Sequence, residues 1–100
     1  MKIEKEELIL ALKALADTRR LKIIELLSKG SMCACEVLDH FDVTQPTLSH
    51  HMKILEKANL IVVEKKGQWH HYTIREETVT HLFSNMEDIF NNMICQIKLE

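Results

Sequence analysis

Residues 44–55 read Thr44-Gln45-Pro46-Thr47-Leu48-Ser49-His50-His51-Met52-Lys53-Ile54-Leu55, and this stretch decides the fold. Thr44 is a good N-cap residue, and Pro46 fits the first turn of a helix, where a missing N–H costs little. When residues are placed about 100° apart on a helical wheel, apolar and polar side chains separate onto opposite sides. The stretch therefore predicts an amphipathic helix with one buried side and one exposed side. The predicted buried side consists of Leu48, Met52, Ile54, Leu55 and Ala58, with His51 packed near it.

The polar side of this helix carries side chains that suit contacts with DNA. Gln pairs bidentately with adenine, Ser and His bond base edges or phosphates, and Lys contacts phosphate. Residues 44–75 carry five basic and two acidic side chains, although the whole chain has a net charge of −2. Contacts with DNA phosphates require such local positive charge. The alternative for any single one of these residues is an ordinary solvent-exposed position with no ligand. We predict DNA contacts from Gln45, Ser49, His50 and Lys53 on this helix and from Lys65, Lys66 and Gln68 at a hairpin tip.

Helical and strand-like patterns flank this stretch on both sides. One hundred residues make one domain, and two glycines with one proline leave little room for the many turns of an all-β fold. The order of four helices, a hairpin and a last helix predicts a mainly α winged helix-turn-helix, as a single domain over residues 1–100. The expected helices cover about 4–15, the residues after the N-cap Asp17 up to Lys29-Gly30, about 32–40 after the N-cap Ser31, 45–58 and about 76–97; the strands cover 61–65 and 69–74, with a turn at Lys66-Gly67.

The last predicted helix carries a long apolar stripe that a small monomer has little left to cover. The simplest interpretation is that this stripe forms a helical seam, meaning a helix–helix interface, between two copies of the chain. The alternative is that the helix folds back on its own core. Residues 76–100 have a net charge of −4, so this segment is expected to face away from DNA. Trp69 and Tyr72 are expected to pack at the base of the hairpin. The stripe consists of Val79, Leu82, Phe83, Met86, Phe90, Met93 and Ile97.

A thiol pair, Cys33-Ala34-Cys35, lies about ten residues ahead of the DNA-reading helix. Soft and borderline ions prefer thiolates. Residues i and i+2 of an α-helix point about 200° apart, so binding one ion is expected to distort the start of the short helix. That distortion would lower DNA affinity through a coupling of roughly 1–3 kcal/mol. The alternative is that both cysteines are small buried hydrophobic residues.

Several other classes of protein fit this sequence poorly. The start, Met1-Lys2-Ile3-Glu4-Lys5-Glu6-Glu7, is too charged for a signal peptide, and no apolar run approaches the ~20 residues of a membrane span. We therefore expect a cytoplasmic protein with no membrane partner, in which three cysteines do not form a disulfide framework. There is no phosphate-cradling glycine loop, nucleophile elbow or acid–base pair, so an enzyme is not expected.

Four motifs in order resemble the ArsR/SmtB family of metal-responsive repressors. They are Ala16-Asp17-Thr18-Arg19-Arg20-Leu21-Lys22-Ile23, Cys33-Ala34-Cys35, Val43 to Leu55, and Gly67-Gln68-Trp69-His70-His71-Tyr72. The resemblance implies a homodimer joined through the first and last helices, which binds an inverted-repeat operator in double-stranded DNA. Effector binding would release the DNA and derepress efflux or detoxification genes. The implied DNA contacts are Thr44, Gln45, Ser49 and His50, with Thr47 as a further candidate.

The Cys-x-Cys pair resembles the thiolate site of the arsenical repressors, which implies As(III) or Sb(III) as effector. Cadmium- and lead-sensing relatives add cysteines from the N-terminal segment, and here none precedes Cys33, so Cd(II) and Pb(II) are less favoured. Arsenical repressors often have a third cysteine where this chain has Leu38. Cys95 is therefore a candidate third ligand, or else an interface residue. No cofactor is expected to be required for folding.

Other sensing sites and functions remain as alternatives. The zinc-type site of the last helix needs paired Asp and His ligands, and the residues around His81 lack that pattern. A mixed site from the cysteines with Glu36, Asp39 or His40 is a weaker possibility. The same fold could instead sense oxidants or polysulfides through a Cys33–Cys95 or Cys35–Cys95 pair. A further alternative is a winged-helix protein-interaction module with no role at DNA.

Overall fold

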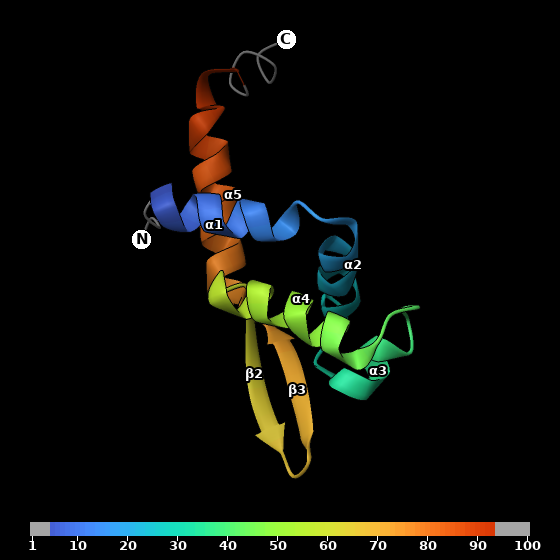
Figure 1. The fold of residues 1–100 in the computed structure, drawn as a ribbon. Helices are drawn as coiled ribbons and strands as arrows, with labels where there is room; N and C mark the ends of the chain where they lie inside the picture. Colours follow the sequence, from blue (N-terminus) through green and yellow to red (C-terminus); the bar gives the residue numbers. More distant parts are fainter. Residues whose placement is uncertain (1–4, 94–100) are drawn as a thin grey trace.

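The computed structural model describes residues 5–93 and has a helical body from which a narrow hairpin projects (Figure 1). Within these residues the predicted winged helix-turn-helix is confirmed, with one short strand that the sequence patterns did not predict. The elements, in chain order, are α1 (Lys5–Leu15), α2 (Thr18–Leu27), β1 (Met32–Cys33), α3 (Ala34–Leu38), α4 (Gln45–Lys57), β2 (Ile61–Lys66), β3 (Trp69–Ile74) and α5 (Glu76–Ile89).

The hydrophobic core lies where α1, α2 and α4 pack against one another and against the sheet. The predicted buried side of α4 is confirmed, since Leu48, Met52, Leu55 and Ala58 are buried and Ile54 packs partly against them. His51 is also buried, as expected. The largest fully buried side chains are Ile23, Val37, Met52, Leu55, Leu60 and Ile61.

Side-chain hydrogen bonds define where α2 and α4 begin, and a left-handed residue marks where α4 ends. Asp17 accepts from the backbone N–H groups of Arg19 and Arg20 at 2.9 and 3.1 Å and so caps α2. The Thr44 hydroxyl caps α4 by accepting from the N–H of Thr47 at 3.4 Å. Asn59, at φ +60°, ends α4 in the left-handed conformation that commonly closes helices. The predicted N-caps Asp17 and Thr44 are therefore confirmed.

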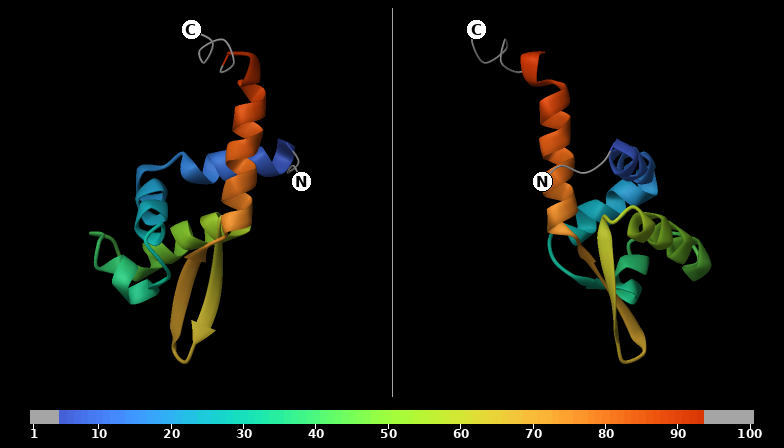
Figure 2. Two further views of the ribbon diagram at one scale, coloured as in Figure 1. Left: turned by 180° about the vertical axis from the view of Figure 1, so that it is seen from behind. Right: turned by 90° about the vertical axis from the view of Figure 1, so that its left-hand side faces the viewer.

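The hairpin is antiparallel and joins β2 to β3 through the two residues Gly67 and Gln68. Gly67 has φ +66°, which fits the expected turn, and β2 runs one residue further than predicted, to Lys66. On its other edge β3 pairs with β1, so that Cys33 lies opposite His71. Figures 1 and 2 show the hairpin extending from one end of the body and α5 from the other.

The segment around the cysteines differs from the prediction of a helix over about 32–40 capped by Ser31. The chain is extended through Met32 and Cys33 and becomes helical only at Ala34, so α3 has five residues. Cys33 itself is the N-cap of α3, because its sulfur accepts from the N–H of Cys35 at 3.4 Å. Pairing with β3 holds this segment in an extended conformation that local helical spacing does not reveal.

Two aromatic side chains near the hairpin base behave differently. Tyr72 is buried against the core, as expected. Trp69 is 55% exposed, so the expectation that it packs at the hairpin base is wrong. Trp69 pairs with Lys66 next to the turn, at the far end of the hairpin from its base, where it lines a cavity together with Ala34 of α3.

Several apolar side chains of α1 and α5 are exposed to solvent. Only Leu82 is buried in α5 among the residues that the structure describes, and Phe83 is 69% exposed. The predicted stripe therefore does not fold back completely on its own core. The expectation of one helix over about 76–97 is wrong in its end, because α5 ends at Ile89 with Phe90 as its C-cap. Ile97 lies outside the described residues. No helix within residues 5–93 is long and apolar enough to cross a membrane. The exposed apolar side chains are Ile9 and Leu10 of α1, Phe83 and Ile89 of α5, and Phe90 and Met93 just after α5.

A charge placed in this apolar stripe tests whether a second copy of the chain covers it. We expect Phe83→Glu to convert a dimer into a monomer, because a carboxylate buried in an apolar seam loses its hydration without a partner. Sedimentation velocity gives the mass directly against the 11.7 kDa of one chain. Ser84→Glu is the matched control, since Ser84 is exposed and lies on the opposite side of α5. A Phe83→Glu protein that sediments like the wild type would contradict a seam at α5.

Candidate DNA-binding face and thiol pair

The exposed side of α4 presents the polar residues that the sequence singled out. Gln45, Ser49, His50 and Lys53 are all exposed, on the side of the helix away from Leu55. Thr47 is half-buried, and its hydroxyl oxygen accepts from the Thr44 hydroxyl at 3.0 Å. The two threonines are thus engaged in the helix cap, while the other four side chains are open to a ligand.

The hairpin brings its own polar side chains towards the same side. Lys65, Lys66 and Gln68 are exposed around its turn. Gln68 lines the same cavity as Gln45 and Ser49, so the start of α4 and the hairpin are close neighbours. If the major groove of DNA lay against α4, the hairpin would therefore be close enough to contact the neighbouring DNA backbone.

The two thiols of the Cys-x-Cys pair converge. The Cys33 and Cys35 sulfurs lie 2.6 Å apart, whereas the sequence analysis expected them to point about 200° apart on one helix. The correction follows from the backbone, because Cys33 is extended, with φ −69° and ψ 148°, and only Cys35 is helical. The buried Cys33 and the exposed Cys35 thus form a two-sulfur site without prior unwinding of α3.

The hydrogen bond between the two thiols makes them chemically unequal. It lowers the pKa of the Cys33 thiol, which the N–H of Cys35 also favours as a thiolate. The same hydrogen bond raises the pKa of the Cys35 thiol. Cys33 is therefore the thiol of the pair that ionises first.

The other predicted ligands do not gather around the thiols. The Glu36 carboxylate accepts from the N–H of Cys33 at 2.9 Å and completes the cap of α3. Within residues 5–93, no group of three or more His, Cys, Asp and Glu residues is placed to hold a metal ion. A mixed site with Asp39 or His40 is therefore not formed among these residues. Cys95, the candidate third thiol, lies outside them.

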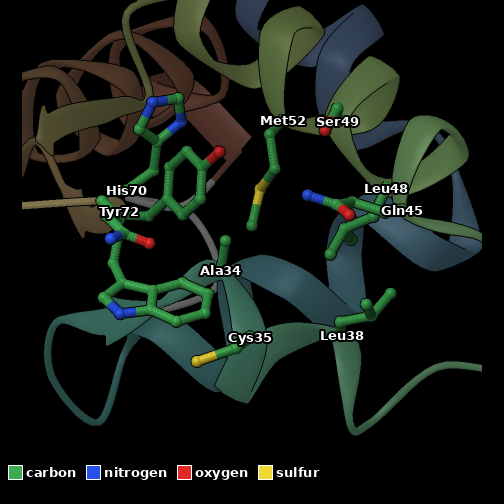
Figure 3. Close-up of a pocket in the computed structure, with 11 residues that line it drawn as sticks. Ala34, Cys35, Leu38, Gln45, Leu48, Ser49, Met52, His70 and Tyr72 are labelled. Carbon is green, nitrogen blue, oxygen red and sulfur yellow. The ribbon is translucent and has the colours of Figure 1, made fainter.

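A cavity of about 290 Å³ lies between α3, α4 and β3, next to the thiol pair. Figure 3 shows Met52 reaching into it from α4, Ala34 from the opposite side, and the ring of Tyr72 along one wall. Cys35 lies at its edge, and Gln45 and Ser49 line the part nearest the DNA-binding face. No local sequence pattern indicates this cavity, because its walls come from three separate elements.

A second feature that the sequence analysis missed is a hydrogen-bond network beneath α4. Arg20 donates to Nδ1 of His51 at 3.1 Å and to the carbonyl of Ala14 at 2.6 Å, and it pairs with Asp17 at 3.9 Å. Since Arg always donates, His51 must accept at Nδ1 and carry its proton at Nε2. The network ties α4 to the end of α1 and the start of α2. Burial lowers the pKa of His51, which favours this neutral form.

Comparison with known proteins agrees with this geometry. A sequence model described as "Bacterial regulatory protein, arsR family" matches residues 17–63. An arsenical resistance operon repressor of Staphylococcus xylosus is 45% identical over 86 residues, which cover 86% of this chain and 82% of the relative.

Solved structures share the fold over most of its length. The crystal structure of an ArsR family transcriptional regulator superposes with a TM-score of 0.84 at 26% identity, covering 93% of this chain and 96% of that one. A homodimeric winged helix-turn-helix DNA-binding domain from Mycobacterium bovis superposes with a TM-score of 0.70 at 25% identity, covering 89% and 82%.

The Arg20–His51 hydrogen bond predicts how stability depends on pH. The unfolded chain takes up a proton at the ordinary His pKa of 6.5, whereas the folded chain does so only at lower pH. The stability contributed by neutral His51 is present above pH 6.5 and is lost as the pH falls through the lowered pKa of the folded chain. Urea unfolding at pH 7.5 and 5.5 should therefore show a smaller pH effect in His51→Asn, whose amide oxygen still accepts from Arg20. His50→Asn, at the exposed neighbouring position, is the matched control, and equal pH effects in His51→Asn and wild type would contradict this role.

Proposed function

The chain belongs to the ArsR family of bacterial regulatory proteins, and from this premise we propose that it represses transcription until a trivalent metalloid binds its thiols. In this proposal a homodimer of the single domain 1–100 binds an inverted-repeat operator in double-stranded DNA, in the cytoplasm. As(III) or Sb(III) then bonds to Cys33 and Cys35, and the protein leaves the DNA. Members of this family are regulators and not enzymes, which agrees with the absence of catalytic motifs from the sequence.

The convergence of the two sulfurs is the observation that carries the proposal. The Cys33 and Cys35 sulfurs, 2.6 Å apart, present two soft ligands to one atom, and thiolates are the ligands that a thiophilic metalloid prefers. A relative of 45% identity is itself named as an arsenical resistance operon repressor. Because no cysteine precedes Cys33 in this sequence, we favour As(III) or Sb(III) over Cd(II) or Pb(II).

The position of the thiols in the fold links metalloid binding to the elements that we propose contact DNA. Cys33 belongs to β1, which pairs with β3 of the hairpin, and it also caps α3. Val37 of α3 is fully buried in the same core as Leu48 and Met52 of α4. Replacing the thiol hydrogen bonds by bonds to arsenic removes the sulfur cap of α3, and the change is transmitted to both DNA-binding elements.

The DNA face is tested by removing side chains from α4. Ser49→Ala and His50→Ala should each weaken binding to DNA by about 1–3 kcal/mol, because each removes a base or phosphate contact. The measurement is fluorescence anisotropy with a duplex that the reduced wild-type protein selects from a randomised pool. Ser84→Ala, on α5, should bind like the wild type. If both α4 variants kept full affinity, this face of α4 would not be the reading face.

The sensor is tested by replacing each thiol separately. Cys33→Ser and Cys35→Ser should keep their affinity for the selected duplex, since serine also caps helices, and should no longer be released by arsenite. The experiment is run anaerobically, with arsenite, antimonite, Cd(II), Pb(II) and hydrogen peroxide as separate additions. Normal release of either variant by arsenite would rule out the pair as the sensor. Release of the wild type by peroxide alone would move the assignment to a thiol redox sensor.

A further inference from the structure

The cavity beside the thiols has the size and lining of a receptor for one small ring. Its volume of about 290 Å³ falls below the usual range for drug-sized ligands, which begins at roughly 300 Å³. An apolar cavity of about 150 Å³ already suffices for benzene. Its apolar walls come from Ala34, Leu38, Leu48, Met52, Trp69 and Tyr72.

The bonding capacity of arsenic supplies the second argument. Trivalent arsenic forms three bonds, and Cys33 and Cys35 are the two free thiols in the part of the chain that the structure describes. An arsenic atom held by both has one bond left, at the edge of the cavity that Cys35 lines. That bond leads either to oxygen, as in inorganic arsenite, or to carbon, as in an organic arsenical. Only an apolar carbon substituent makes use of the apolar walls.

We propose that the preferred effector is a trivalent arsenical with one aryl group, which places its ring in this cavity. This inference rests on the proposed function, because it uses the same two thiols. With phenylarsine oxide as the example, two S–As bonds form and the As–O double bond breaks. The two thiol protons leave with the oxygen as one molecule of water. Arsenic stays trivalent, so the step needs no oxidant or reductant.

The ring would act directly on the DNA-binding face. Gln45 and Ser49 of α4, and Gln68 of the hairpin, line the same cavity as Cys35. A ring in this cavity therefore touches the side chains that we expect to contact DNA. The Met52 side chain of α4 reaches into the space that the ring would take (Figure 3). The ring would therefore push Met52 and α3 apart.

The test uses the fluorescence of Trp69, the single tryptophan of the chain, which lines the cavity. Reduced, full-length protein is titrated with phenylarsine oxide, arsenite and phenylarsonic acid. Phenylarsine oxide should half-saturate at a concentration at least about tenfold below that of arsenite, because its ring is buried. Phenylarsonic acid has the same ring but pentavalent arsenic and should give no response. A response to it equal to that of phenylarsine oxide would overturn the requirement for bonds to the thiols.

A variant whose larger side chain fills the cavity distinguishes two contributions to binding of phenylarsine oxide: burial of the ring and bond formation between arsenic and the thiols. Ala34→Leu should weaken binding of phenylarsine oxide about tenfold or more and change arsenite binding less than twofold. Ala16→Leu adds the same volume at an exposed site in the α1–α2 turn and should change neither. Leu38→Phe narrows the cavity from the same helix and provides the measurement if circular dichroism shows that Ala34→Leu is unfolded.

The outcomes distinguish this inference from the function on which it rests. If Ala34→Leu and Leu38→Phe bind both trivalent arsenicals like the wild type, or lose both equally, the cavity does not hold the ring. In that case release of DNA by arsenite still supports the proposed repressor. If no arsenical binds the wild type, both proposals fail together.

Discussion

One constraint governs the whole molecule: α4 must bury one side completely while the other side remains in water. Leu48, Met52 and Leu55 achieve this by packing under α1, α2 and the sheet, so each of those elements is placed by its contact with α4. The hydrophobic effect favours this burial without fixing the rotation of the helix to the last few degrees. The hydrogen bonds from Arg20 add that directional restraint, because they join His51 to a carbonyl of α1.

The thiol pair lies where α4 meets the hairpin, the two elements that we propose bind DNA. Met32 and Cys33 form the third strand of the sheet and so extend the hairpin, whereas α3 packs through Val37 into the core that holds α4. A chemical change at two sulfurs thus has two routes, one along the strand pairing and one through the core. The distance between site and effect is small, so no long chain of coupled residues is needed.

The sequence predicted α4, its caps and the hairpin because each of these depends on residues close together in the chain. Thr44 and Pro46 predict a helix start by their own chemistry, and β-branched and aromatic residues on both sides of Gly67 predict the strands. The extended conformation of Cys33 was missed because it depends on His71, which pairs with it from a distant part of the chain. For the same reason the sulfurs were expected to diverge. The Arg20–His51 hydrogen bond and the cavity also depend on tertiary packing, which no local pattern records.

The brevity of α3 has a kinetic consequence. Isolated helices shorter than about 12 residues are marginal in water, and α3 has five residues, preceded by a strand of two. Such a segment is held by its neighbours and opens by local unfolding far more often than the core does. Amide hydrogens of β1 and α3 should consequently exchange with solvent ahead of those in the middle of α4. Such openings expose the buried sulfur of Cys33, so in the proposed sensor the rate of metalloid binding would be set by how often this short segment opens.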